Sequence, residues 1–247
     1  MYKNKEFFEQ MVNEGKTLKE LSDIFKVRKE TIKYWEKKHN LKLKRDTSRK
    51  YIFNEDYFRD IDTEEKAYFL GLIMADGFVD KKEKLLGISL KNEDSYILEK
   101  LLSELKLESG LKSKKNDTQK VIYVCSKKLV KDLKKYSITP NKTFTIKFPR
   151  LREDLIRHFL RGYFDGDGCV GERQYWLIVS SECFLEYLIE YLEKKFCSKI
   201  YYIKENKSYK LCFCRKNYEI INYIYSDSKV YLKRKKNKYE KFWKHYN

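Results

Sequence analysis

The sequence predicts an α+β protein in which two pseudo-symmetric αββαββα repeats form a saddle, preceded by a small all-α domain. The segments FLGLIMADG at 69–77 and FLRGYFDGDG at 159–168 are near-copies of each other, and the same order of predicted elements follows each copy. A short stretch near the N-terminus has the apolar spacing of two helices joined by a tight turn. These observations predict four parts, which are a helical domain at 1–45, a linker at 46–62, and repeats at 63–150 and 151–247.

The N-terminal stretch TLKELSDIFKVRKETIKYWEKKH at 17–39 predicts two short helices. Its apolar spacing indicates one helix from about Leu18, a turn at 25–27 and a second helix at 29–38. This arrangement resembles a helix-turn-helix, whose second helix enters a major groove. Lys26 stands at the turn position that is commonly glycine and is strained if its φ is positive, so a plain helical hairpin is the alternative. The candidate DNA-facing residues are Arg28, Lys29, Thr31, Lys33 and Tyr34.

Each repeat is predicted to begin with a motif helix, the first of which follows Asp62 or Thr63 as N-cap. The first repeat then continues with a strand at 84–90, a helix at 94–105, a hairpin at 111–125 and a helix at 127–135. The second repeat is predicted to have its motif helix at 153–165, a strand at 174–180, a helix at 182–195, strands at 199–204 and 208–214, and a helix at 216–225. Because the order matches, we expect matched folds related by a pseudo-two-fold axis through the motif helices.

Small residues recur four apart in both motif helices, as Gly71 and Ala75 in the first and Gly162 and Gly166 in the second. Residues four apart share a helix face. Two such smooth stripes allow a closer approach than the ~8–10 Å of ordinary helix packing. We therefore expect the two helix ends to meet.

The acids Asp76 and Asp167 stand at those helix ends, each followed by a glycine. Gly77 and Gly168 fit the position after a helix, where glycine adopts the left-handed conformation. Two carboxylates at two negative helix ends are costly unless a cation binds, and Mg²⁺ suits one or two carboxylates completed by water and phosphate. The predicted metal site comprises Asp76 and Asp167 with the preceding residues Ala75 and Gly166. Asp165 is excluded from the pair, because Met74 stands at its place in the first copy.

A single Asp-Gly copy would be read as an ordinary turn after a core helix, but the paired copies resemble the two LAGLIDADG motifs of homing endonucleases. The segments AYFLGLIMADG, ITPNKTFTIKFP, FLRGYFDGDG and VYLKRKKNKYEKF are similar, in this order, to two-repeat members, so the resemblance covers about 51–247. It implies a staggered double-strand break across the minor groove, with Mg²⁺ as cofactor and Mn²⁺ able to substitute.

The resemblance also implies one basic catalytic residue for each acid. Lys142 in PNKT would serve the first repeat, and Lys235 in LKRKK the second. Lys233, Arg234 and Lys236 compete with Lys235, and a plain phosphate-binding run is an equal alternative there.

Side chains on the predicted strands provide candidates for DNA contact, because two-stranded ribbons fit the major groove. Lys112 and Lys114 alternate onto one face of a strand, as Tyr202 and Lys204 do in the second repeat. An ordinary solvated strand face is the alternative at each position. The further candidates on neighbouring segments are Arg173, Gln174 and Lys210.

The composition favours a polyanionic partner, because 55 Lys+Arg against 37 Asp+Glu give a net charge of +18. Six cysteines without a C-x-x-C pair and three histidines show no zinc pattern. No apolar stretch approaches the ~20 residues of a membrane span. We therefore expect a cytoplasmic monomer that binds double-stranded DNA and no membrane.

The predicted function is site-specific hydrolysis of phosphodiester bonds in DNA, over a long recognition site that the N-terminal domain extends. One alternative is a catalytically inactive DNA-binding regulator on the same fold, although both acids are retained. The other is a maturase with intron RNA as partner, which the helix-turn-helix mildly disfavours.

Overall fold

The computed structural model describes residues 2–43, 52–114, 117–171 and 175–244. The chain divides into two compact units, Met1–Lys50 and Tyr51–Asn247, each with its own hydrophobic core. None of the helices in the described part is both long and apolar enough to cross a membrane.

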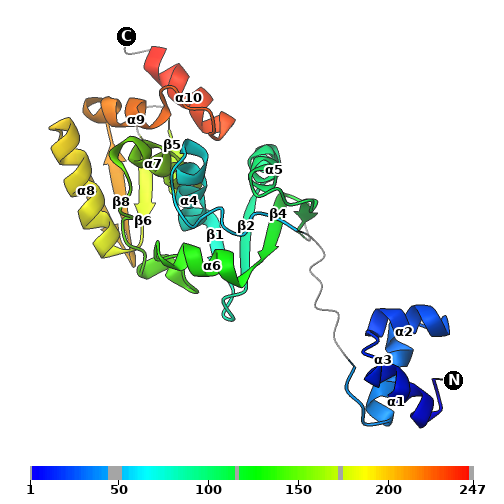
Figure 1. Ribbon diagram of the computed structural model, residues 1–247. Helices are drawn as coiled ribbons and strands as arrows, with labels where there is room; N and C mark the ends of the chain where they lie inside the picture. Colours follow the sequence, from blue (N-terminus) through cyan, green and yellow to red (C-terminus); the bar gives the residue numbers. More distant parts are fainter. Residues whose placement is uncertain (1, 44–51, 115–116, 172–174, 245–247) are drawn as a thin grey trace. The chain divides into compact units, whose positions relative to one another are not determined.

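The first unit consists of three helices around a small core (Figure 1). The helices are α1 (Lys5–Asn13), α2 (Leu18–Phe25) and α3 (Lys29–Lys38). The core is formed by Phe8, Leu21, Ile32 and Leu43. The structure confirms the two predicted helices and adds α1, which supplies Phe8 as the third side of the core.

The start of α2 and the turn after it are fixed by local hydrogen bonds. Thr17 Oγ1 accepts from the Glu20 N–H at 3.3 Å, and the Glu20 carboxylate accepts from the Thr17 N–H at 2.7 Å, which is a capping box. Lys26 adopts the left-handed conformation, with φ 52° and ψ 40°. The strain that the sequence predicts at this turn is therefore present.

The second unit contains two αββαββα repeats, as predicted. The first comprises α4 (Glu64–Asp76), β1 (Gly77–Val79), β2 (Leu85–Lys91), α5 (Ser95–Glu104), β3 (Lys112–Ser113), β4 (Gln119–Cys125) and α6 (Lys127–Lys134), followed by the short 3-10 helix η2 (Lys142–Phe144). The second comprises α7 (Glu153–Asp167), β5 (Gly168–Val170), β6 (Tyr175–Val179), α8 (Glu182–Phe196), β7 (Tyr201–Glu205), β8 (Ser208–Phe213) and α9 (Tyr218–Tyr225), followed by α10 (Lys233–Lys244).

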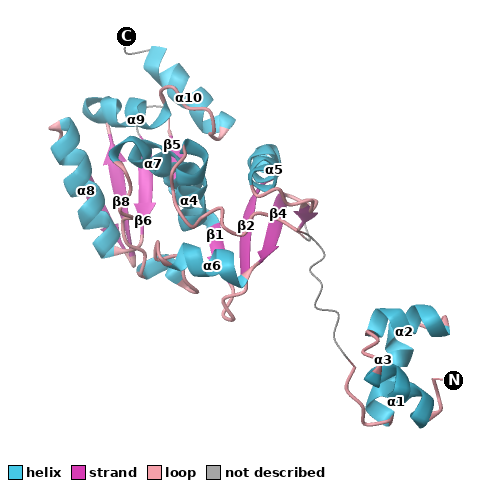
Figure 2. Cartoon of the chain, viewed as in Figure 1, coloured by secondary structure: helices cyan, strands magenta, loops and turns pink. Residues whose placement is uncertain are grey.

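Each repeat forms one antiparallel four-stranded sheet, in the order β1-β2-β4-β3 and β5-β6-β8-β7. The motif helices α4 and α7 stand side by side between the two sheets (Figure 1). Of the remaining helices of this unit, α5 and α6 pack against the first sheet and α8 packs against the second (Figure 2). This arrangement confirms the predicted fold class.

Three features of the second unit were not expected from the sequence. The strands β1 and β5 begin directly at the motif glycines and have only three residues each, which is too short for a periodicity. The helix α10 lies in a basic run whose apolar positions are too few to indicate an amphipathic helix. Part of the expected linker is built into this unit, because Tyr57 and Phe58 are buried in its core and the Asn54 N–H donates to Leu105 O at 2.8 Å.

Candidate active site

The two motif helices touch through their backbones at the glycines. A Cβ on Gly71 would lie 2.0 Å from the Phe159 carbonyl oxygen, and one on Gly162 would lie 1.9 Å from the Tyr68 carbonyl oxygen. Real Cβ atoms do not approach other atoms so closely, so only glycine fits at either position. One turn further on, a Cβ on Gly166 would lie 2.3 Å from the Ala75 Cβ. The C-terminal ends of α4 and α7 are therefore in contact.

The glycines that follow the acids are required for a different reason from the one that the sequence suggests. Gly77 has φ −79° and ψ 158°, and Gly168 has φ −85° and ψ 153°, so both are extended. The prediction of a left-handed conformation was wrong, because each helix runs directly into a strand. A Cβ on Gly77 would lie 2.6 Å from Ile73 O, and one on Gly168 would lie 2.4 Å from Phe164 O.

The contact places the Asp76 and Asp167 carboxylates next to each other. Asp76 is the more exposed residue of the two, and Asp167 is half-buried. Partial removal from water raises the pKa of Asp76, and it raises the pKa of Asp167 to about 6, where the negative charge of Asp76 contributes as well. The Tyr163 hydroxyl donates to Asp167. Sequence reasoning missed Tyr163, because Leu72 stands at its place in the first motif.

A buried lysine lies at the end of each motif helix. Lys142, in η2, is 8% exposed, and its Nζ donates to the Ala75 carbonyl oxygen at 3.3 Å. Burial lowers the pKa of Lys142, against the opposing effect of Asp167 and Asp76. Lys235, in α10, is 3% exposed.

The Lys235 ammonium is held by three carbonyl groups at the end of α7. Its Nζ donates to Phe164 O at 2.8 Å, to Asp165 O at 2.6 Å and to Gly168 O. Burial lowers the pKa of Lys235 to about 8, and the charge of Asp165 opposes this shift. Lys142 and Lys235 thus occupy corresponding places, one in each repeat.

The neighbours that compete with Lys235 in the sequence lie elsewhere. Lys233 Nζ lies 4.8 Å from the Tyr96 ring centre, and Lys236 Nζ lies 4.1 Å from that of Tyr231. Arg234 Nε donates to Asp94 at 2.8 Å. Of these four basic side chains, Lys235 is the one whose charged group reaches the end of α7.

The donor set fits a hard divalent cation. Asp76 and Asp167 supply two carboxylates, and the described residues contain no group of three or more His, Cys, Asp or Glu side chains that could hold a metal. A site with two carboxylates suits Mg²⁺, which completes its coordination with water and phosphate oxygens. The pKa of each acid is raised chiefly by removal from water, and a bound cation would favour the ionised forms. Of the further predicted ligands, the Ala75 carbonyl accepts from the Lys142 ammonium, and Gly166 lies at the helix contact.

The strand candidates of the first repeat lie on the uncovered face of their sheet. Lys112 pairs with Val121 and therefore shares the face of Tyr123, whose ring centre lies 5.6 Å from Lys112 Nζ. Lys114 Nζ donates to Gln119 Oε1 at 2.8 Å. The exposed Phe78 joins this face, because it pairs with Gly87 opposite Tyr123.

The strand candidates of the second repeat divide between the two faces. Tyr202 pairs with Leu211 and Lys204 with Tyr209, so both point to the face that carries the buried side chains of β8, but both are themselves exposed on the edge strand β7. Tyr202 and Lys204 thus share one face of their strand, and Lys210, which pairs with Ile203, lies on the opposite face.

The uncovered face of the second sheet carries Lys210 and a row of apolar and aromatic side chains. By the strand register they are Trp176, Ile178, Tyr201 and Ile203. The alternation of buried and more exposed positions along β6 and β8 could have identified this row of residues. Arg173 and Gln174 lie outside the described residues.

In the first unit, the start and outer side of α3 carry the candidate helix-turn-helix contacts. Arg28, Lys29, Lys33 and Tyr34 are exposed and Thr31 is half-buried. Lys38 Nζ lies 4.5 Å from the ring centre of Trp35. The exposed side of α3 is therefore basic and aromatic.

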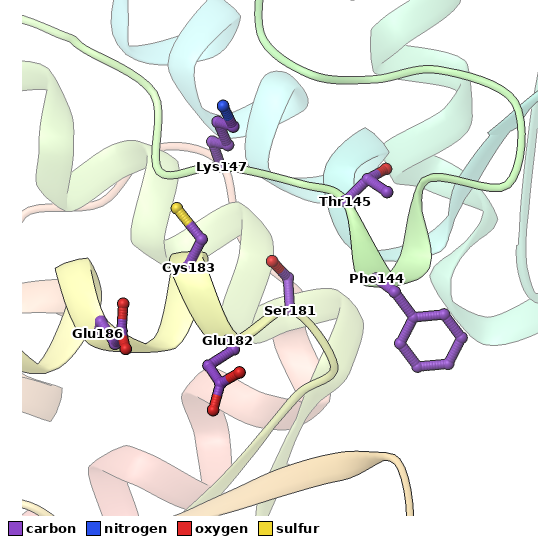
Figure 3. A pocket seen from close by; sticks show the side chains of 7 residues that line it. All are labelled: Phe144, Thr145, Lys147, Ser181, Glu182, Cys183 and Glu186. Carbon is purple, nitrogen blue, oxygen red and sulfur yellow. The ribbon is translucent and has the colours of Figure 1, made fainter.

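A pocket lies beside the η2 turn, away from the acid pair (Figure 3). Ser181, the N-cap of α8, donates to Ile146 O at 2.6 Å at its base. Neither acid and neither buried lysine lines it, so we assign it no role in the site. The lining residues are Phe144, Thr145, Lys147, Ser181, Glu182, Cys183 and Glu186.

Comparison with known families agrees with this geometry. The model of the LAGLIDADG-like domain matches residues 63–136 and 154–231. The model of the MerR HTH family regulatory protein matches residues 16–63. The chain therefore belongs to the LAGLIDADG-like domain family and carries an N-terminal helix-turn-helix, as predicted.

Among curated proteins, the chain is similar to the replication factor C small subunit of Methanocaldococcus jannaschii, with 31% identity over 164 residues. The match covers 63% of this chain and only 8% of that protein. Among solved structures, the homing endonuclease I-WcaI bound to its DNA recognition sequence has a TM-score of 0.53 and 18% identity, covering 75% of this chain and 91% of that one. Full-length DUF199/WhiA from Thermatoga maritima has a TM-score of 0.52 and 18% identity, and the match covers 78% of this chain and 65% of that one. These structural likenesses concern the fold.

Proposed function

We propose that this protein is a site-specific, Mg²⁺-dependent double-strand DNA endonuclease that acts as a monomer. The observation that carries the proposal is the contact between the ends of α4 and α7, which brings together Asp76 and Asp167 with one buried lysine for each. The two repeats in one chain supply both half-sites, so no second copy is required.

The reaction is hydrolysis of one phosphodiester bond in each strand. A bound Mg²⁺ would neutralise charge on the scissile phosphate and favour ionisation of water. Asp76 and Asp167 would hold it. Lys142 and Lys235 would offset the charge that develops on the phosphoryl oxygens. The oxygen of water forms the new bond to phosphorus, the bond to the 3′ oxygen breaks, and that oxygen takes up a proton.

The proposed DNA-binding surface is the uncovered face of the two sheets, with the N-terminal unit adding contacts beyond it. Lys112, Lys114 and Lys210 supply positive charge there, and the exposed rings of Phe78 and Tyr123 supply apolar contact. The net charge of +18 supports a polyanionic partner. The relative I-WcaI was solved bound to its DNA recognition sequence, which supports the same partner here.

The test is cleavage of DNA that carries this gene's own locus without the intron or other inserted element. The full chain is assayed with Mg²⁺ and with EDTA, in the wild type and in Asp76→Asn and Asp167→Asn. We expect double-strand cutting that requires Mg²⁺ and that each substitution reduces by at least about 10²-fold, since each removes a metal-binding carboxylate.

Asp154→Asn is the matched control, because Asp154 is an exposed aspartate of the same helix α7 and its carboxylate pairs with the neighbouring Arg152. It should cut at the wild-type rate. Metal-independent cutting, or cutting that survives both acid substitutions, would contradict the proposal.

A second candidate is a DNA-binding regulator without nuclease activity. The match of residues 16–63 to a helix-turn-helix model of regulatory proteins favours it. Tight, sequence-dependent DNA binding without cutting in Mg²⁺ or Mn²⁺ would support this candidate, whereas splicing of flanking intron RNA would support a maturase.

A further inference from the structure

The loop between α9 and α10 crosses the motif helices, where buried side chains of α7 hold its backbone. Arg161 Nε donates to Val230 O at 2.7 Å. The Asp165 carboxylate accepts from the Leu232 N–H at 2.7 Å. Both side chains are almost completely buried, so these hydrogen bonds are shielded from water. The path of the loop is therefore set from α7.

Asp165 accepts two further hydrogen bonds, and both donors are buried tyrosine hydroxyl groups. Tyr68 donates at 2.9 Å from α4, and Tyr225 donates at 2.7 Å from α9. All three partners of the carboxylate are donors, which is the arrangement that an ionised carboxylate accepts. Asp165 thus joins both motif helices, α9 and the loop at one charged group.

Leu232 is the residue at which the loop becomes α10. Its N–H is held by Asp165, and its carbonyl accepts from the N–H groups of Lys235 and Lys236, each at 3.0 Å. A carboxylate that fixes Leu232 therefore fixes the first turn of α10. That turn carries Lys235, whose Nζ returns to the carbonyl groups of Phe164 and Asp165.

The described residues of the first repeat hold no equivalent of this arrangement. Met74 stands at the place of Asp165. Lys142 lies in the short helix η2, and its Nζ donates to Ala75 O. Through Leu232, a change at position 165 therefore acts directly on Lys235 and not on Lys142.

We propose that Asp165 is a positioning residue for Lys235. It fixes Leu232 and the start of α10, and in this way holds the Lys235 ammonium at the end of α7. The consequence for catalysis rests on the proposed nuclease function. Loss of Asp165 slows cleavage of the strand that Lys235 serves and leaves cleavage of the other strand near the wild-type rate, so nicked duplex accumulates.

The first experiment measures the placement of Lys235 without relying on nuclease activity. The full chain is treated with formaldehyde and a borohydride reagent, and the methylation rate of each lysine is followed by mass spectrometry. In Asp165→Met, which introduces the residue of the first repeat, Lys235 should react about tenfold faster or more, because its local opening is easier. Lys142 should react at the wild-type rate.

Two variants keep this experiment interpretable. Asp165→Asn has nearly the same shape as the wild-type side chain but lacks the carboxylate, so it replaces Asp165→Met if that variant fails to fold. It should also speed up methylation of Lys235, but by a smaller factor. Met74→Leu changes the corresponding buried position of α4 at similar volume, and it should alter neither lysine. Thermal denaturation of each variant confirms that labelling was measured on folded protein.

The second experiment measures cleavage of each strand of the target duplex separately, with one label on each strand. Asp165→Met and Lys235→Met should slow the same strand, and the double variant should be no slower than Lys235→Met alone, as expected for residues that act as one unit. Met74→Leu should cut both strands at the wild-type rates.

Either of two results would overturn the inference. One is unchanged Lys235 methylation in folded Asp165→Met and Asp165→Asn, and the other is equal slowing of both strands. If the wild type cuts no DNA, the proposed function fails, and the methylation result alone decides whether Asp165 positions Lys235.

Discussion

At the scale of the residue, the two motif acids differ although their motifs are near-copies. Asp76 is the more exposed residue, whereas Asp167 is half-buried and accepts a hydrogen bond from Tyr163. Burial, with the nearby negative charge of Asp76, raises the pKa of Asp167 to about 6. Without a cation, the ionised form of Asp167 therefore weakens the folded state.

This difference predicts how stability depends on pH. Because the pKa of Asp167 is higher in the folded state than the ordinary 3.8, the folded chain holds a proton that the unfolded chain has lost between about pH 4 and 6. Stability contributed by this group is thus present below that window and is lost as pH rises through it. In EDTA, Asp167→Asn should be more stable than the wild type at pH 7.5, by about 1–2 kcal/mol, and the difference should shrink towards pH 4.5.

Thermal or urea denaturation at the two pH values measures this difference. Asp154→Asn, at an exposed position of the same helix, controls for the loss of a surface charge. Saturating Mg²⁺ should stabilise the wild type more than Asp167→Asn. A variant less stable than the wild type at pH 7.5 in EDTA would contradict the prediction.

At the scale of the element, the contact between α4 and α7 is decided by two glycines that face the opposite backbone. A Cβ at either position would lie far inside van der Waals contact with a carbonyl oxygen, at 2.0 Å for Gly71 and 1.9 Å for Gly162. Backbone atoms cannot move aside as a flexible side chain does. The helices must therefore separate if either glycine gains a side chain.

We expect Gly71→Ala and Gly162→Ala each to destabilise the protein by about 3 kcal/mol, at the upper end for overpacking. Urea denaturation measures this loss. The control is Gly110→Ala, because a Cβ at that position meets nothing within 4 Å. Equal stability of Gly71→Ala and Gly110→Ala would show that the helices are not in this close contact.

The turn between α2 and α3 predicts the opposite effect for an added glycine. Lys26 has φ 52°, a conformation that costs a residue with a side chain roughly 1 kcal/mol. Lys26→Gly should therefore stabilise the N-terminal unit by about this amount, whereas Lys29→Gly, at the first residue of α3, should not. Hydrogen exchange of the Leu21 amide, which donates to Thr17 O within this unit, reports the change. Faster exchange in Lys26→Gly would contradict it.

At the scale of the whole molecule, the two units have separate hydrophobic cores. The acids and both buried lysines belong to the second unit, whereas residues 1–50 contribute 15 basic and 8 acidic side chains. Chemistry and part of the DNA affinity are therefore assigned to different units.

A chain reduced to residues 51–247 should cut the same positions but bind the target at least about tenfold more weakly. Its affinity should also depend less on salt, since each lost phosphate contact reduces the slope of log affinity against log salt by about 0.9. Titration of labelled duplex at several salt concentrations measures both quantities. An unchanged slope would mean that the N-terminal unit makes no phosphate contacts. Arg28→Ala in the full chain is the matched test at one exposed residue of α3.

The sequence by itself determined the repeat architecture, the helix-turn-helix and the positions of Asp76, Asp167 and the interface glycines. These follow from patterns that local chemistry imposes, namely the periodicity of buried residues, cap residues, and small residues spaced one helical turn apart. Because the motif occurs twice, each pattern could be recognised in two independent segments.

The tertiary structure decided which of several neighbouring candidate residues reach the site. It placed Lys235, and not its three basic neighbours, at the end of α7, since α10 starts where Asp165 holds Leu232. It put Tyr202 and Lys204 on the opposite face of the second sheet from Lys210, because strand register depends on pairing with β8. It also made Gly77 and Gly168 extended. Contacts between residues distant in the chain fix these features, and a local pattern carries no signal for them.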